Sequence, residues 1–479
     1  MNLRHKVTSA VVWNAADIFM RQGIAFVVSI ILARLLSPED FGTLALPALF
    51  LGIANLFVNA GFPMALIHRQ DVTHIDESTV FWFNIGAALL MTLVLFATAP
   101  WIADFFALPS LMPLTMLMAC NVLLGATGAV HSALLIKQLD FKTLLNIGVI
   151  STVIAGAVGV YAAWADYGVW ALAWQSITST FVGALLSWLF SSWRPLFRFS
   201  GNSFKRLFGF GGWLFAGNLL DTLYQRGYTV LIGKFYGTYD LGIYYRANNT
   251  QELPSTIVTN VLSRVAYPLF SVVNQDKQQL RNGVRLSVRS ISFIAAPSML
   301  GLGVMAQPFI RVVFGEQWLS AAPILQVLCV VGLLRPLHVI NLNVLQAQGH
   351  TKLFFQLDIV KKTFGIVLLV CGSYFGIMGI AWSRVIQSIV GVMINGYYSH
   401  KLLDYGMYQQ IMDCLPSFLL GATMAAVVAI ADMWIKIGGV LELIFLITLG
   451  ATFYLACNVL LGISAFKEAI RFMKGEAIA

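Results

Sequence analysis

Long apolar stretches alternate with short polar ones along almost the whole chain, from about residue 7 to residue 461. Each stretch is about 20 residues long, which is the length of a helix that crosses the hydrocarbon core of a bilayer. Glycine, proline and charged residues separate the stretches and set the expected ends of the helices. The pattern predicts helices near 7–32, 43–67, 79–103, 111–136, 145–165, 168–193, 207–232, 241–265, 288–313, 321–346, 354–375, 377–399, 415–434 and 438–461. We therefore expect an all-α integral membrane protein with about fourteen transmembrane helices.

The composition agrees with this interpretation. Hydrophobic residues make up 58% of the 479 positions and charged residues only 11%, with a mean hydropathy of +0.79. Soluble domains carry roughly 25% charged residues, so the composition excludes an ordinary soluble enzyme. The first apolar segment, 7–32, is longer than the core of a signal peptide and lacks a small-residue cleavage site. We interpret it as a retained first helix.

The basic residues predict the orientation of the helices. Most lysines and arginines, among them Lys361, fall on one side of the predicted membrane. The loops on the other side hold only Arg34, Lys234, Arg311 and Lys436. Because positive charge collects in cytoplasmic loops, both termini are predicted to be cytoplasmic. The net charge of +9 is then explained without nucleic acid as a partner.

A weak internal repeat indicates two related halves. Four residues recur 200 positions later: Trp13, Arg34, Asp40 and Gly42 return as Trp213, Lys234, Asp240 and Gly242. Six helices separate the copies, which is typical of parallel repeats that enclose a transport pathway. Coincidence between two short loops is the alternative. The repeat predicts six-helix lobes at 1–200 and 201–405, pseudo-symmetric to each other, and a segment 406–479 with helices 13–14 and a cytoplasmic tail.

Arginines inside predicted helices are the main candidates for a binding site. A charged side chain in a membrane helix costs at least about 2.5–3.5 kcal/mol on insertion scales, so it is expected to face a cavity or a partner. Guanidinium groups match phosphate geometry, and the excess of cations favours an anionic substrate such as a diphosphate or an anionic glycan. Arg246 and Arg384 lie near predicted helix starts, and for them a side chain that extends to the membrane interface is an equal alternative. The five candidates are Arg21, Arg226, Arg335, Arg246 and Arg384.

Two acidic residues accompany these arginines at membrane depth. Asp17 lies one helical turn before Arg21, so it suits the role of counter-ion, and Asp221 precedes Arg226. Either carboxylate could instead couple transport to a proton or sodium gradient. His131 and His338 are further candidates for proton relay, although a buried histidine is more often a packing residue.

No pattern indicates catalysis, a cofactor or a metal site. The five cysteines have irregular spacing, and neither a phosphate-binding loop nor an HExxH motif occurs. Gly209, Gly211 and Gly212 follow no strand, and small residues that let helices approach explain them better. We therefore expect a transporter and not an enzyme.

Several phrases resemble a known family. They are ARLLSPEDFGTLAL after helix 1, ALLIKQLDFK after helix 4, AYPLFS at 266–271, and VFGEQWLSAAPILQVLCVVGLLRPL across helices 9 and 10. They are similar to the polysaccharide transporter family, and most of all to its colanic-acid or exopolysaccharide type of lipid-linked oligosaccharide flippase. That family belongs to a superfamily shared with multidrug extruders and the lipid II flippase.

The resemblance implies a V-shaped, two-lobed fold in the bacterial inner membrane. It implies transport of undecaprenyl-diphosphate-linked repeat units for exopolysaccharide, capsule or O-antigen synthesis, alongside polysaccharide polymerase and chain-length proteins. Helices 13 and 14 are expected to hold the lipid tail beside the membrane lipids. Motif residues in the predicted external loops are expected to shape turns and gates: Asp40, Gly42, Gly315, Glu316 and Trp318.

Two other functions remain as alternatives. An ion-coupled multidrug antiporter of the same superfamily would favour acidic residues in its cavity, whereas arginine predominates here. A membrane polysaccharide polymerase or ligase would need a substantial external loop, and the loops predicted on that side are short.

Overall fold

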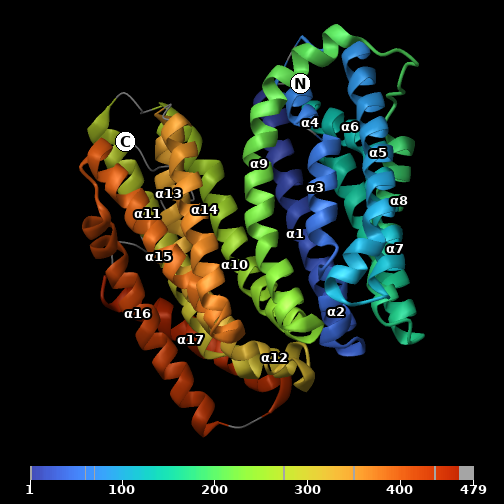
Figure 1. Ribbon diagram of the computed structural model, residues 1–479. Helices are drawn as coiled ribbons and strands as arrows, with labels where there is room; N and C mark the ends of the chain where they lie inside the picture. Colours follow the sequence, from blue (N-terminus) through green and yellow to red (C-terminus); the bar gives the residue numbers. More distant parts are fainter. Residues whose placement is uncertain are drawn as a thin grey trace. The chain divides into compact units, whose positions relative to one another are not determined.

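The computed structural model describes residues 3–59, 61–69, 71–272, 276–348, 351–435 and 438–462, and its regular structure over these ranges is entirely helical (Figure 1). The first helices along the chain are α1 (Leu3–Leu35), α2 (Pro38–Ala45), α3 (Ala48–Asn59), α4 (Phe62–His68), α5 (His74–Phe106), α6 (Leu111–Lys137), α7 (Phe141–Trp164), α8 (Val169–Phe190) and α9 (Gly201–Phe235). The others are α10 (Gly237–Val272), α11 (Lys277–Val304), α12 (Ala306–Val313), the 3-10 turn η1 (Glu316–Trp318), α13 (Ala321–Ala347), α14 (Thr351–Ser373), α15 (Gly376–Leu403), α16 (Met407–Trp434) and α17 (Gly439–Leu460). Lys436 and the side chain of Trp213 lie outside the described residues.

Each of the fourteen predicted segments falls on helical structure. Among the described residues, eleven segments are long and apolar enough to cross a membrane. The helices α9, α10 and α14 are not among these eleven, because their sequences carry more amide and charged side chains. The prediction of an all-α membrane protein is thus confirmed.

The second predicted helix, 43–67, is wrong in detail because the structure divides it. It begins earlier, at Pro38, where the side chains of Ser37 and Asp40 cap the start of α2. Proline at position 47 has no N–H to donate, and Gly61 adopts a left-handed φ of 76°. The segment therefore consists of α2, α3 and α4.

Two compact units make up the chain, 1–242 and 243–479. In the first unit, α7 packs against α1 and α8, α6 packs against α5 and α8, and α9 lies along α3, α4 and α5. In the second unit, α11 packs against α13 and α16, and α15 packs against α13 and α14. The predicted boundaries after residues 200 and 405 stay predictions.

The two copies of the repeat motif meet within the first unit, where α2 crosses the start of α10. A Cβ atom on Gly42 would lie 1.8 Å from the carbonyl oxygen of Thr238, and one on Gly242 would lie 1.9 Å from the carbonyl oxygen of Pro38. Only glycine allows backbones to approach this closely. The contact is reciprocal. Gly42 faces Thr238, and Gly242, 200 positions later, faces Pro38, which is 200 positions before Thr238. This reciprocity supports the predicted repeat.

A buried carboxylate attaches α16 to α11 in the second unit. Asp413, 7% exposed, accepts hydrogen bonds from Arg285 at 2.8 and 3.0 Å and from Arg289 at 2.6 and 2.9 Å. The hydroxyl of Tyr405 donates a further bond of 2.9 Å. Burial and the neighbouring carboxylate raise the pKa of Tyr405, so this hydroxyl stays protonated and remains a donor.

Candidate functional site

A pocket of about 270 Å³ lies in the first unit, among α1, α6, α7 and α8. Most of the described side chains that line it are small or carry a hydroxyl group, and among them Arg21 is the charged one. The hydroxyl side chains are Ser132, Ser151, Thr152, Ser179, Thr180 and Ser187. The pocket has room because α6, α7 and α8 carry glycine and alanine where they face one another.

Arg21 reaches the pocket by crossing α7 at a glycine. A Cβ atom on Gly148 would lie 2.2 Å from Cδ of Arg21, so a larger residue would displace the arginine side chain. The Nη1 atom of Arg21 lies 3.7 Å from Oδ2 of Asp17. The arginine side chain is 51% exposed and that of Asp17 14% exposed. Asp17 thus lies beside Arg21, and much of the guanidinium stays accessible; the role of Asp17 as counter-ion stays a prediction.

The hydroxyl groups of the pocket are adaptable. Ser151 and Thr152 donate to the carbonyl oxygen of Gly148, and Ser187 donates to that of Gly183. Each oxygen still has a lone pair to accept a hydrogen bond, and each hydroxyl can rotate to donate to a ligand. One cation among neutral hydroxyls suits a ligand that combines an anionic group with sugar hydroxyls.

A second pair of arginines lies in the second unit, on α13 and α15. Arg384 donates hydrogen bonds to the side chains of Asn248, at 2.5 Å, and Tyr244, at 3.3 Å. Arg335 is half-buried, and the charges that act on it are those of Glu252 and Arg384. Two predicted site residues are thus brought together beside polar side chains of α10.

Arg246 has a different environment. Only 5% of it is exposed, and its guanidinium lies 4.6 Å from the ring centre of Phe314 and 4.7 Å from that of Trp318. Such stacking of a cation on aromatic rings is attractive, especially when buried. It joins the start of α10 to the turn after α12, and a binding role for Arg246 stays a prediction.

The other candidates are less enclosed or serve packing. Asp221 and Arg226 are both exposed on α9. His131 is fully buried, with its ring centre 4.8 Å from that of Trp188 and 5.1 Å from that of Trp193. The described contacts of His131 are those of a packing residue.

The motif residues of the predicted external loops shape turns. Gly315 has a left-handed φ of 106°, and the carboxylate of Glu316 forms an ion pair with Arg311 at 2.8 Å. Trp318 is fully buried, and Asp40 caps α2. The side chains of the VFGEQW phrase thus build one ordered turn.

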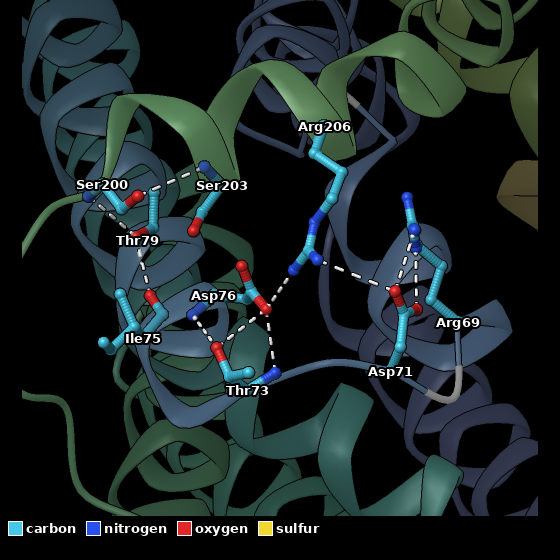
Figure 2. A network of polar contacts seen from close by, with 9 residues as sticks. All are labelled: Arg69, Asp71, Thr73, Ile75, Asp76, Thr79, Ser200, Ser203 and Arg206. Atoms are coloured by element: carbon cyan, nitrogen blue, oxygen red, sulfur yellow. Dashed lines mark hydrogen bonds and ion pairs between the residues drawn. The ribbon is translucent and has the colours of Figure 1, made fainter.

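The start of α9 is fixed by an ion network that sequence reasoning missed (Figure 2). The guanidinium of Arg206 pairs with Asp76, which is 1% exposed. The same guanidinium lies 3.6 Å from the carboxylate of Asp71. Arg69 donates two bonds of 3.0 Å to Asp71 and holds the pKa of that carboxyl below its usual range. Arg206 lies 130 positions from Asp76 along the chain, so the sequence gives no local signal of their pairing.

Sequence analysis also missed the burial of Lys361. The residue lies within α14 and is only 7% exposed, and its place on the basic side of the membrane stays a prediction. Its ammonium donates a hydrogen bond of 3.1 Å to Oδ1 of Asn395 on α15.

The described residues contain no group of three or more His, Cys, Asp or Glu side chains that could hold a metal ion.

Solved membrane proteins share this fold. The structure matches "Lipid II flippase MurJ, inward closed conformation" with a TM-score of 0.75, at 16% identity, over 94% of this chain and 98% of that one. It also matches an inward-facing multidrug transporter of the MATE family with a TM-score of 0.62, at 15% identity, over 82% and 98% of the two chains.

The sequence comparison then gives the family. Residues 31–323 match the model of the polysaccharide biosynthesis protein family, and the chain belongs to this family. One relative is "Teichuronic acid biosynthesis protein TuaB" of Bacillus subtilis, 29% identical over 78% of each chain. Another is "Lipopolysaccharide biosynthesis protein WzxC" of Escherichia coli, 27% identical over 86% of this chain and 84% of that one.

Proposed function

We propose that this protein is a flippase that moves undecaprenyl-diphosphate-linked oligosaccharide repeat units across the bacterial inner membrane. The units would serve exopolysaccharide, capsule or O-antigen synthesis. Membership of the polysaccharide biosynthesis family and the MurJ-like fold support a transport role and not an enzymatic one. The observation that carries the proposal is the accessible guanidinium of Arg21 in a pocket of hydroxyl side chains.

In this proposal the diphosphate binds to arginine and the sugars bind to the hydroxyl side chains. Arg21 offers a planar fork of donors that matches a phosphate group. Arg335 and Arg384 would form a second contact with an anionic group of the substrate. Arg226 on α9 is a further candidate. The lipid tail would stay in the bilayer beside α16 and α17. Fourteen crossings with cytoplasmic termini, and alternating access of the pathway, complete the mechanism that we propose.

The first test is a leaflet-resolved assay of lipid-linked oligosaccharides in cells depleted of the protein. Mass spectrometry identifies the accumulated lipid, and glycosidase access in spheroplasts and inverted vesicles locates it. We expect accumulation that faces the cytoplasm. Accumulation facing the periplasm would instead indicate a polymerase or ligase, and drug sensitivity without accumulation would indicate a multidrug antiporter.

Complementation of the depleted cells tests the role of Arg21. Charge-assisted hydrogen bonds contribute about 1.5–3 kcal/mol each, so Arg21→Ala is expected to lower flipping roughly 10- to 100-fold. Arg21→Lys keeps the charge but loses the fork, and an intermediate rate is expected. The matched control is Arg198→Ala, because Arg198 is an exposed arginine on the connection between α8 and α9. Equal rates for all of these variants and the wild type would remove Arg21 from the mechanism.

A further inference from the structure

Three helices of the second unit share a buried chain of polar side chains. Nζ of Lys361 on α14 donates to Oδ1 of Asn395 on α15, at 3.1 Å. Nδ2 of the same asparagine lies 3.3 Å from Nδ1 of His338 on α13. Nε2 of His338 lies 3.0 Å from Oγ of Ser388 on α15. One amide group therefore bridges an ammonium and an imidazole.

These residues are closely enclosed. Exposed fractions are 7% for Lys361, 1% for Asn395 and 4% for Ser388. A Cβ atom on Gly391 would lie 2.6 Å from Cε1 of His338, so the imidazole is seated against the backbone of α15. An ionisable side chain buried at membrane depth is costly, and such residues usually mark transport or proton pathways. Here the hydrogen-bond acceptor of the ammonium is a neutral amide, which compensates a charge less well than a carboxylate does.

The orientation of the Asn395 amide limits the protonation states that the two groups can adopt. An amide nitrogen can only donate, so Nδ1 of His338 must accept and cannot carry a proton in this arrangement. The imidazole is then neutral, with its proton on Nε2, and donates to Ser388. Lys361 donates to the amide oxygen, and this orientation of the amide admits its charged form.

Reversing the amide of Asn395 would exchange the two charges. The oxygen would then accept from a protonated Nδ1 of His338, and the NH₂ group would face Lys361. An ammonium has no lone pair to accept that bond, whereas a neutral amine has one. Each orientation of the amide thus suits one charged group and excludes the other.

We propose that Lys361, Asn395 and His338 form a one-proton switch, in which either the lysine or the histidine is charged but not both. To change state, Nζ of Lys361 gives one proton to water and Nδ1 of His338 takes one from water. The net charge of the trio does not change. The positive charge moves from α14 to α13, where Arg335 lies one helical turn before His338.

The surrounding charges are defined in the same unit. Arg335 acts on His338 from α13, and Asp358 and Lys362, which pair with each other at 2.5 Å, act on Lys361 from α14. Glu252 on α10 and Arg384 on α15 act on Arg335. On α11 and α16, which pack against α13 and α15, Arg285 and Arg289 bind Asp413. Charging His338 adds positive potential beside Arg335, which would strengthen its hold on a diphosphate. Only this link to the substrate rests on the proposed function.

The test is nitrogen-15 NMR of the full-length protein, labelled at histidine and held in lipid nanodiscs, over a range of pH. The signal of His338 is identified among those of the seven histidines by its loss in His338→Gln. In the wild type we expect a neutral His338 with the proton on Nε2. Lys361→Met removes the competing charge, so the titration midpoint of His338 should rise by about one pH unit or more. Lys361→Arg keeps a charge that cannot be given up, so the midpoint of His338 should fall below that of the wild type.

Lys362→Met is the matched control, because it removes the adjacent lysine, whose partner is Asp358. It should shift the midpoint of His338 less than Lys361→Met does. A proton on Nδ1 in the wild type at neutral pH would overturn the proposal. Equal midpoints in Lys361→Met and the wild type would also overturn it. Neither result depends on a flipping assay, so this proposal can fail while the flippase function stands.

Discussion

At the scale of single residues, the environment of each arginine separates binding from packing. Arg21 and Arg384 reach polar surroundings, whereas Arg246 is buried between two aromatic rings. All five predicted arginines look alike in sequence, as a cation within an apolar segment. Their different partners give them different expected roles.

Arg246→Met should therefore lower stability more than transport. Loss of a buried cation–π contact is expected to cost about 2 kcal/mol, because the ring faces of Phe314 and Trp318 lose their charged partner. The matched variant is Arg384→Met, which should lower flipping while largely keeping stability. Thermal melting in detergent and the flipping assay, normalised to folded protein, separate the two effects. The reverse outcome would make Arg246 a substrate ligand.

At the scale of elements, close approach at glycine fixes how helices cross. The contact between α2 and the start of α10 joins backbone to backbone, so no side-chain movement can relieve an added methyl group. The pocket in the first unit also depends on small residues, since Gly148 makes room for Arg21. Substituting these glycines changes the structure in different ways, because one faces backbone and the other a flexible side chain.

Gly42→Ala is expected to destabilise the protein strongly. Its Cβ atom would overlap the carbonyl oxygen of Thr238, and overpacking typically costs about 1–3 kcal/mol or more. Gly23→Ala on α1 is the control, because nothing lies within 4 Å of its added Cβ atom and alanine favours a helix. Thermal melting of both variants checks the prediction. Equal melting temperatures would show that the crossing of α2 and α10 tolerates a side chain.

At the scale of the whole molecule, helix number and loop charge set the predicted topology. The described helices supply eleven segments apolar enough to span a membrane, and three more polar helices complete the predicted fourteen. Polar side chains on those three helices are expected if they border a wet pathway. The basic loops alternate with the other loops, which predicts that both termini are cytoplasmic.

Cysteine labelling in whole cells tests that topology. In a background without the five native cysteines, Tyr167→Cys should react with a membrane-impermeant maleimide, because the α7–α8 loop is predicted to be external. Gln138→Cys, in the α6–α7 loop, should react only after the cells are opened. Both native side chains are exposed, so burial does not bias the comparison. Labelling of Gln138→Cys in intact cells would invert the predicted orientation.

The sequence by itself determined the helical class, the approximate position of each helix and the identity of the unusual membrane arginines. These features are local, because hydrophobicity and punctuation act over about 20 neighbouring residues. The interruption of the second helix was missed, although Pro47 and Gly61 were its local signals.

Only the tertiary structure decided what each charged side chain touches. Arg21 meets Gly148, Arg246 meets Trp318, and Lys361 meets Asn395, each pair joining two different elements of the fold. The hydrophobic pattern buries a helix face without selecting its partners, whereas helix packing brings particular residues together. The sequence therefore predicted a transporter with arginines in its membrane helices. The packing of the helices distinguished an arginine suited to binding, an arginine suited to structure and a buried lysine.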